Sequence, residues 1–163
     1  MLLLLVRHAL AAERDESRFP DDSLRPLLPK GRRVQARMSR RLEKLGLAPA
    51  TILSSPWKRA WQTAGILAEE TGVAKKRRVT CPPLAQDPAL DALAEAIGPR
   101  PDDELVALVG HEPWMSELAS LLLTGSPTRL AIDFPKSGVM GIDVPVVAAA
   151  AGRLAFYLTP KAR

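Results

Sequence analysis

Short apolar runs alternate along this chain with segments whose apolar residues recur at helical spacing. Residues 2–6, LLLLV, are apolar without a break, which is typical of a strand that is covered on both faces of a sheet. In residues 30–45 the apolar side chains instead return at every third or fourth position, as on one face of a helix. Strands that alternate with helices predict an α/β fold with a mostly parallel sheet.

Cap residues and glycines set the expected ends of these elements. The pairs Ser55-Pro56 and Asp87-Pro88 each predict a helix start, with the first residue as N-cap, and Gly72 predicts a helix end. The last two strands lie close together in sequence, so we expect them toward one edge of the sheet, one of them antiparallel. The expected strands are residues 2–6, 51–53, 78–81, 104–109, 139–144 and 154–158, and the expected helices are residues 30–45, 55–72, 87–97 and 113–124. The expected inner faces of the first two helices are Val34, Met38, Leu42 and Leu45, and Trp57, Ala60, Trp61, Ala64 and Leu67.

Length and cysteine content limit the class of protein. The 163 residues fit one domain, residues 1–163, which can bury a core without disulfide or metal support. The single cysteine, Cys81, excludes an internal disulfide, and with no secretory signal at the start we expect a cytoplasmic protein. Cys81 lies in an expected strand with no histidine close in sequence, which favours a core residue over a nucleophile. No stretch approaches the ~18 apolar residues of a membrane span, so we expect no membrane association.

The positive charge of the chain admits anionic partners. The net charge is +5, and basic residues cluster at residues 32–33, 40–41 and 75–78. Aromatic residues make up only 4% of the chain, and none interleaves these clusters as a base-stacking surface requires, which argues against nucleic acid. We interpret the clusters as solvated helix faces and a loop.

The two histidines of the chain each follow an expected buried strand. His8 comes after residues 2–6, and His111 comes after residues 104–109. In open α/β sheets, ligands bind at the carboxyl ends of the strands. One histidine alone is more often a hydrogen-bonded core residue or a surface residue. Two histidines at the same end of two strands favour a shared site.

Arginines occupy matching positions. Arg7 precedes His8, and Arg59 lies in the first turn of the second expected helix, where free N–H groups attract anions. A guanidinium fork also matches the oxygens of a phosphate group. Arg25, in SLRPL, is a third candidate. An ordinary solvated arginine is the alternative for Arg59, and an ordinary loop arginine is the alternative for Arg25.

This set of residues suits phosphoryl transfer without a metal. No histidine, cysteine or carboxylate pattern near either histidine has metal-ligand spacing, and no glycine-rich phosphate loop is present. A neutral His8 could attack phosphorus with one ring nitrogen while its other nitrogen is held by a backbone carbonyl. Arg7, Arg59 and His111 could then neutralise the phosphoryl oxygens.

Several segments resemble the histidine phosphatase superfamily, which has a phosphoglycerate mutase-like fold. They are LVRHA at residues 5–9, SSPWKRAWQTA at 54–64 and VGHEP at 109–113. SLRPLLPKGRRVQA at 23–36 and the closing LTP at 158–160 are similar to the branch of SixA-like phosphohistidine phosphatases. The similar segments run in order along nearly the whole chain, and the second is the most specific.

The resemblance implies a fold and a role for each candidate residue. The fold would be a three-layer α/β/α sandwich, and no metal or other cofactor would be required. His8 would be the nucleophile that becomes phosphorylated, and Arg7, Arg59 and His111 would bind the phosphoryl group. Arg25 would make an accessory contact with the phosphate or the substrate.

Two positions depart from the common pattern of the superfamily. Ala9 stands where most members have glycine, although the SixA-like branch often has alanine there. Members that cleave esters carry an acidic proton donor after the third strand, in a motif that is missing from PPLAQDPALDALAEAIG. The candidates that remain are Asp87, which also fits a helix N-cap, and Glu112, which also fits a first-turn acid near a helix dipole. Asp91 fits a solvated helix residue.

The missing acid favours a phosphohistidine substrate. An alkoxide needs protonation to leave a phosphate ester, which is worth ~10²–10⁴-fold in rate. Imidazole, with a conjugate-acid pKa of ~6.5, leaves more easily. The sequence therefore predicts a phosphatase that hydrolyses phosphohistidine on proteins through phospho-His8. The alternatives are a small-molecule phosphomonoesterase with Asp87 or Glu112 as donor, and a catalytically dead module that binds phosphate or phosphoproteins.

Overall fold

The computed structural model describes residues 1–85 and 89–160, in which six strands form one sheet. The strands are β1 (Leu2–Arg7), β2 (Thr51–Ser54), β3 (Arg78–Thr80), β4 (Leu105–Gly110), β5 (Val139–Asp143) and β6 (Arg153–Leu158). The helices are α1 (Pro29–Lys44), α2 (Lys58–Thr71), α3 (Leu90–Ile97) and α4 (Trp114–Thr124). The strand order is β3-β2-β4-β1-β5-β6, which places β1 and β4 side by side at the centre.

The sheet is mostly parallel, as predicted. β1, β2, β3 and β4 all run in one direction, and β5 pairs antiparallel with both β1 and β6. The predicted antiparallel strand near one edge is therefore β5. Parallel strands bring their carboxyl ends to one side of the sheet. His8 and His111 lie on that side, because they directly follow β1 and β4.

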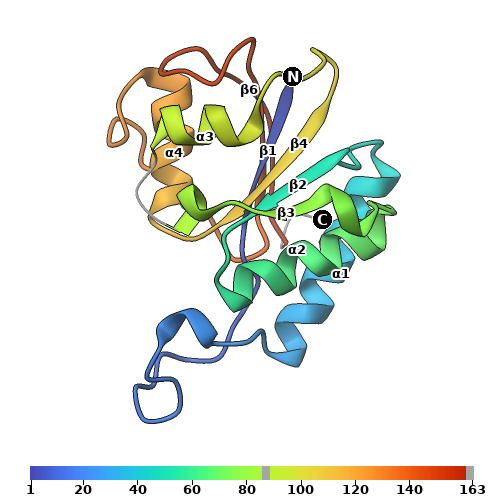
Figure 1. Cartoon of the computed structure of the whole chain (residues 1–163), viewed down its shortest axis with the longest axis vertical. Coiled ribbons are helices and arrows are strands. Elements are labelled where there is room, and N and C mark those ends of the chain that lie inside the picture. The colour runs from blue at the N-terminus through green and yellow to red at the C-terminus, as the bar shows by residue number, and fades with distance from the viewer. Residues whose placement is uncertain (86–88, 161–163) are drawn as a thin grey trace.

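Helices cover both faces of the sheet and give three layers, α/β/α (Figure 1). Leu4 and Val6 of β1 pack in the cluster that includes α1 and α2, whereas Leu3 and Leu5 pack in the cluster that includes α3 and α4. Burying one leucine fully stabilises a fold by about 1.5–3 kcal/mol. The unbroken apolar run of β1 thus contributes side chains to the cores on both faces of the sheet.

Two helix faces differ from the prediction. Leu45 is 55% exposed because α1 ends one residue earlier, and the left-handed Gly46 (φ 70) turns the chain away. Buried Gln35 and Ser39 share that inner face instead, joined by a hydrogen bond of 3.2 Å. On the second helix Ala60, Ala64 and Leu67 are buried as expected, but Trp57 and Trp61 are only half-buried.

Two helix starts also differ from the prediction. α2 begins at Lys58 with Trp57 as N-cap, so Ser55 is not its cap. Ser55 is fully buried at the end of β2, where its hydroxyl is used in the site described below. α3 begins at Leu90 with Ala89 as N-cap, and the predicted cap Asp87 lies outside the described residues.

The predicted loop of residues 9–29 crosses the carboxyl side of the sheet and projects below it in Figure 1. A 3-10 turn at Asp22–Leu24 and a bridge between Ala11 and Leu27 give it shape. Gly31 allows the backbone of this loop to lie close to α1, because a Cβ atom at Gly31 would overlap the carbonyl oxygen of Leu10.

A Gly31→Ala variant should therefore unfold more easily than the parent. Alanine is the better helix former by about 1 kcal/mol, but overlap with fixed backbone costs typically 1–3 kcal/mol, so the net change should be destabilising. Urea unfolding measures it. Gly65→Ala in α2 is the matched control, because its Cβ would meet only the flexible guanidinium end of Arg78. Equal stability of Gly31→Ala and the parent would contradict the close approach.

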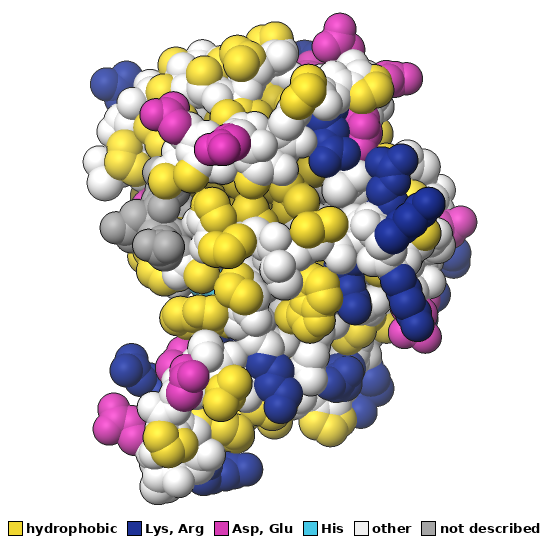
Figure 2. Space-filling view, viewed as in Figure 1, with side chains coloured by type: hydrophobic (Ala, Val, Ile, Leu, Met, Phe, Trp, Pro, Cys, Tyr) yellow, Lys and Arg dark blue, Asp and Glu magenta, His cyan; other side chains and the backbone are white. Residues whose placement is uncertain are grey.

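The remaining sequence interpretations concern Cys81 and the basic clusters. Cys81 is buried in the core on the α3 and α4 side, as predicted, and burial raises the pKa of its thiol. The basic clusters lie mainly on exposed parts of α1 and on the turn before β3, and Figure 2 shows many Lys and Arg side chains on that side of the molecule. Arg40 pairs with Glu70 across α1 and α2 at 2.8 Å.

Among the described residues, no helix is long and apolar enough to cross a membrane.

Candidate active site

The register of the two central strands brings the two histidines together. Arg7 pairs with Gly110 across β1 and β4, and the next backbone amide, that of His8, donates to the Gly110 carbonyl at 3.0 Å. His8 and His111 therefore leave the sheet side by side, with ring centroids 5.1 Å apart. Both side chains are buried, at 7% and 2% exposure.

Hydrogen bonds fix the tautomer of His8. Its Nε2 lies 3.2 Å from Nε of Arg59, which can only donate, so Nε2 accepts and carries no proton. The proton then resides on Nδ1, which donates to the carbonyl oxygen of Ala9 at 2.7 Å. The predicted backbone partner of His8 is present, and it is Ala9.

His8 is held neutral by its surroundings. Burial is the main cause that lowers its pKa from 6.5 to about 3, and the positive charges of Arg59, Arg7 and Lys136 act in the same direction. The Ala9 carbonyl opposes the shift only in part. At neutral pH the ring therefore presents an unprotonated Nε2 toward the guanidinium of Arg59, in the state that a nucleophile needs.

Arg59 is placed by the start of α2 and by the loop after β1. It is buried, and its Nη1 and Nη2 donate to the carbonyl and the carboxylate of Asp22 at 2.8 and 3.1 Å. Its guanidinium carbon lies 4.5 Å from the ring centre of Trp57. Thr63 links the helix to the turn, because its hydroxyl donates to the Arg59 carbonyl at 2.7 Å and accepts from the Ala9 amide at 3.0 Å.

Asp22 joins two of the candidate arginines. Its Oδ1 accepts from Nε of Arg25 at 2.7 Å, while its Oδ2 accepts from Arg59. These bonds, the one from Arg25 first, hold the pKa of the Asp22 carboxyl below its usual range. Arg25 also donates to the Ala12 carbonyl at 2.6 Å. The sequence reasoning missed Asp22, although its place three residues before Arg25 in DDSLRPL could have suggested an ion pair.

The sequence did not predict that Ser55 takes part in the site, because the pair Ser55-Pro56 is also typical of a helix start. Its hydroxyl contacts Nε2 of His111 at 2.8 Å, and the Trp57 amide donates to the same oxygen at 3.3 Å. Nδ1 of His111 is buried without a partner among the described residues. Burial lowers the pKa of His111 from 6.5 to about 3, with smaller contributions from His8 and Arg59. His111 is thus a second neutral imidazole.

A cavity of about 510 Å³ collects the predicted residues. Arg7 lies in its wall with Nη1 donating to the Phe134 carbonyl at 2.5 Å, while its Nε is buried without a partner among the described residues. Lys136 lies there too and was not predicted, since nothing in its local sequence points to a site. The wall includes Arg7, His8, Arg25, Arg59, His111 and Glu112. A larger cavity of about 770 Å³ lies along α2 and contains neither histidine in its lining.

The structure places only one of the two predicted acids. Glu112 lines the cavity, and its carboxylate accepts from the amide and the hydroxyl of Ser116 at 3.0 and 2.8 Å. Burial nevertheless raises the pKa of Glu112 above its usual value. Asp87 lies outside the described residues, and Asp91 is an exposed residue of α3. The exposed Glu13 is a further carboxylate in the cavity wall.

Ala9 needs no glycine-like backbone. The non-glycine residues with positive φ in the described ranges are Ser137 and Ala150, so Ala9 has an ordinary conformation. Its methyl group is fully buried and packs with Ala11 and Leu27. Alanine is therefore compatible with this turn.

Within residues 1–85 and 89–160, no group of three or more His, Cys, Asp or Glu side chains is arranged to hold a metal ion. Cations outnumber carboxylates in the cavity wall: two neutral imidazoles and the cationic side chains of Arg7, Arg14, Arg25, Arg59 and Lys136 line it, against the carboxyl groups of Glu13 and Glu112. Such a set is suited to an anion with several oxygens, such as a phosphoryl group.

Solved structures of the same fold include phosphatases of two kinds. The protein histidine phosphatase SixA complexed with tungstate superposes with a TM-score of 0.80 at 19% identity, over 98% of this chain and 97% of that one. The putative phosphohistidine phosphatase SixA from Agrobacterium tumefaciens gives a TM-score of 0.73 at 24% identity, over 98% and 97% of the two chains. A mycobacterial glucosyl-3-phosphoglycerate phosphatase gives 0.65 at 18% identity, over 94% and 96%.

Sequence comparison identifies the family. An uncharacterized protein of Picosynechococcus sp. (strain ATCC 27264 / PCC 7002 / PR-6) is 36% identical over 143 residues, which are 87% of this chain and 84% of the relative. Residues 3–80 match the family model of the histidine phosphatase superfamily (branch 1). This match includes Arg7, His8, Arg25 and Arg59, and the similar fold extends along nearly the whole chain. The chain belongs to the histidine phosphatase superfamily.

Proposed function

We propose that this protein is a phosphatase that hydrolyses phosphohistidine on proteins through a covalent phospho-His8 intermediate. Membership of the superfamily implies phosphatase activity. The observation that carries the proposal is the state of His8: a neutral ring with its proton fixed on Nδ1 and its Nε2 directed at Arg59. That arrangement is what an attack on phosphorus requires.

The surrounding residues would bind the phosphoryl group. Arg7, Arg59 and His111 would contact its oxygens, and Arg25 would make an accessory contact through the cavity wall they share. The buried Nε of Arg7 and Nδ1 of His111 lack partners among the described residues, so both offer unused hydrogen-bonding capacity. An anion in the cavity would also offset the mutual repulsion of the arginines.

In the first step, the lone pair of His8 Nε2 forms a bond to phosphorus as the P–N bond of the substrate breaks. The departing imidazole takes that electron pair and leaves neutral when its other nitrogen carries a proton. Phospho-His8 keeps the proton on Nδ1, bonded to Ala9, so its ring can also leave neutral. Water then forms the new P–O bond and gives its proton to the phosphate product, which restores His8.

The nature of the leaving group favours phosphohistidine. Imidazole that carries a proton on its other nitrogen departs neutral and needs no donor at the breaking bond, whereas an alkoxide needs a donor worth ~10²–10⁴-fold. The two oxygens of Glu112 accept hydrogen bonds from Ser116 and are already engaged. Two solved structures with the same fold carry names that match this choice, a protein histidine phosphatase SixA and a putative phosphohistidine phosphatase SixA.

A small-molecule phosphomonoesterase is the second candidate, and Glu112 is the observation that favours it. This carboxyl lines the same cavity, and burial raises its pKa, which is the direction that a proton donor needs. A mycobacterial relative in fold, a glucosyl-3-phosphoglycerate phosphatase, acts on a small molecule according to its name. Asp87, the other predicted donor, remains a prediction.

A substrate panel separates the two candidates. We expect the highest kcat/KM on a phosphohistidine protein or peptide, and much lower values on sugar phosphates, nucleotides and p-nitrophenyl phosphate. Release of inorganic phosphate is the readout for all of them. Preference for a phosphate ester over every phosphohistidine substrate would overturn the proposal in favour of the second candidate.

Glu112→Gln should leave phosphohistidine hydrolysis within about twofold of the parent, because neutral imidazole departs without a donor. Any hydrolysis of phosphate esters should fall, by ~10²-fold or more if Glu112 donates the proton. Ser116→Ala is the control, since it removes a hydroxyl bonded to Glu112 and leaves the carboxyl in place. A loss of phosphohistidine turnover in Glu112→Gln that Ser116→Ala does not share would show that Glu112 serves the leading reaction as well.

A further inference from the structure

A second cavity adjoins the candidate active site. It has a volume of about 470 Å³ and lies between the first half of α1, residues 133–137 before β5, and the end of β6. Leu10 and Lys136 line both cavities. A ligand with its phosphoryl group beside His8 could therefore continue past these two residues into the second cavity.

The second cavity carries an excess of positive charge. Lys30, Arg37 and Lys136 line it, against one exposed carboxylate, Asp133. Lys30 and Arg37 are seven residues apart on α1 and so share one face of the helix. None of the three cations forms an ion pair with a side chain in the described part of the chain. These charges are thus available to an anionic ligand.

Lys136 stands where the two positive regions meet. Its pKa is lowered, first by burial and then by repulsion from Arg7, Arg25 and Arg59. A carboxylate between Lys136 and the face of α1 would reduce this repulsion. The wall that the two cavities share and the positive charge of both cavities therefore favour the same ligand, one that carries a phosphoryl group and a carboxylate.

The rest of the lining of the second cavity is apolar or uncharged, which suits a larger ligand than a small inorganic anion. Leu10, Val34 and Pro135 give the cavity an apolar part. Ser137 in its wall is buried, and its hydroxyl has no partner among the described residues. A ligand carbonyl or carboxylate could accept from that hydroxyl, whose burial without a partner otherwise costs free energy. The backbone amide of Ser137 donates to the Arg7 carbonyl at 3.1 Å, so this contact lies next to the phosphoryl site.

We propose that the second cavity binds an acidic peptide segment that flanks the phosphohistidine of a protein substrate. Carboxylates of that segment would lie against Lys30, Arg37 and Lys136, its apolar groups against Val34, and a carbonyl at Ser137. The cavity is within the size range of ligand sites and lies outside the phosphoryl site, so it would select the sequence around the histidine. This inference rests on the proposed function and specifies its substrate class.

The test uses two synthetic phosphohistidine peptides of equal length. One carries aspartate and glutamate on both sides of the histidine, and the other carries asparagine and glutamine at the same positions. We expect the parent protein to prefer the acidic peptide by about 10-fold in kcat/KM at low salt, and expect added salt to reduce this preference. The Lys30→Glu/Arg37→Glu variant should lose the preference while its kcat/KM on free phosphohistidine stays unchanged.

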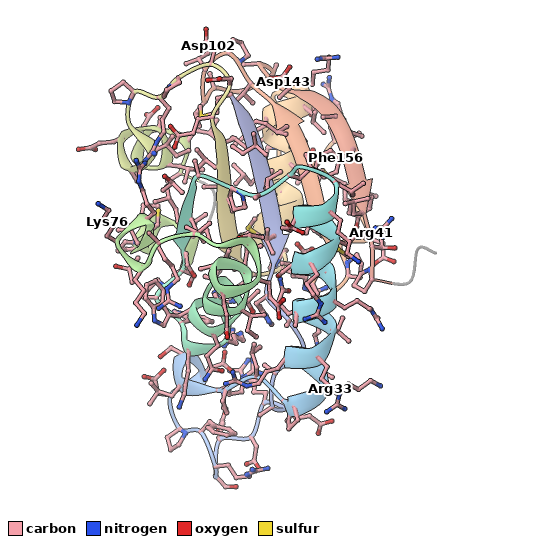
Figure 3. All side chains as sticks on the ribbon, turned by 90° about the vertical axis from the view of Figure 1, so that its right-hand side faces the viewer. Arg33, Arg41, Lys76, Asp102, Asp143 and Phe156 are labelled. Atoms are coloured by element: carbon pink, nitrogen blue, oxygen red, sulfur yellow. The ribbon has the colours of Figure 1, made fainter. Side chains whose placement is uncertain are left out.

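Arg32→Glu/Lys76→Glu is the matched control. It also replaces one lysine and one arginine by glutamate at exposed positions, so both variants change net charge equally. Neither residue lines the second cavity, and Figure 3 shows Lys76 across the view from α1. The control should keep the preference for the acidic peptide. An equal loss in both variants, or no preference in the parent, would overturn the inference.

A binding measurement separates this inference from the proposed function. Fluorescein-labelled peptides of both kinds, without the phosphoryl group, are titrated with each protein, and anisotropy gives the dissociation constants. Tighter binding of the acidic peptide to the parent and the control, but not to Lys30→Glu/Arg37→Glu, supports the cavity assignment even without phosphohistidine turnover. Equal binding of both peptides to the parent overturns it, even if phosphohistidine turnover is rapid.

Discussion

His8→Ala should reduce kcat for phosphohistidine hydrolysis by on the order of 10⁴–10⁶-fold, as loss of a covalent nucleophile does in other enzymes. Nε2 of His8 is the atom that would bond to phosphorus, and His111, in the same cavity wall, would bind the phosphoryl oxygens. Turnover of a phosphohistidine peptide, followed by phosphate release, measures the loss. Normal hydrolysis by this variant would refute the covalent mechanism.

The same variant should remove the covalent label. The parent, quenched in alkaline denaturant during turnover, should carry one phosphoryl group on the peptide that contains His8, seen by mass spectrometry. His8→Ala should carry none. Far-UV circular dichroism and urea unfolding serve as controls, because the variant removes a buried ring. A parent that binds phosphate but shows neither label nor turnover would instead be the catalytically dead module.

Arg59→Ala should lower kcat/KM by about 10³-fold, the scale on which removing a transition-state cation or donor acts. Arg59→Lys should recover only part of the activity, because lysine keeps the charge but lacks the fork that reaches both His8 and Asp22. Asp22 retains Arg25 as a partner in both variants, so the loop keeps an ion pair. Lys58→Ala, one residue earlier and exposed, is the control and should stay near parental activity.

Arg59→Ala should also change the titration of His8. Arg59 is one of the positive charges that lower the pKa of His8, so its removal should raise that pKa. Burial is the larger cause, so the pKa should stay below 6.5. NMR of the imidazole C–H protons over pH measures the change. An unchanged His8 pKa in Arg59→Ala would show that the guanidinium is not electrostatically coupled to the ring.

The sheet and its order of strands and helices follow from patterns that are local in sequence. Continuous apolar runs marked β1 and β4, and helical periodicity marked α1 and α2. Placing both histidines at the carboxyl side needed only the rule that parallel strands share an end. Leu45 was misplaced because periodicity does not show where a helix stops to within one residue.

The contacts around the histidines could not be predicted in the same way. Asp22 reaches Arg59 across 37 residues of chain, and Lys136 arrives from a loop more than 120 residues after His8. The local sequence could suggest the ion pair of Asp22 with Arg25, but not the contact of Asp22 with Arg59 or the place of Lys136, because these depend on how long loops fold back. Ser55 was misassigned because its sequence fits an N-cap, while the structure uses its hydroxyl at His111.

The pairing of β1 with β4 has a consequence for how this protein can vary. The spacing of the two imidazoles is set by backbone hydrogen bonds between strands, so shifting either strand by one residue would turn one ring to the opposite face of the sheet. Insertions within β1 or β4 should therefore be eliminated by selection. The turns at the other end of the sheet, residues 99–104 and 144–152, lie beyond the opposite ends of these strands and can change in length without disturbing the distance between the rings.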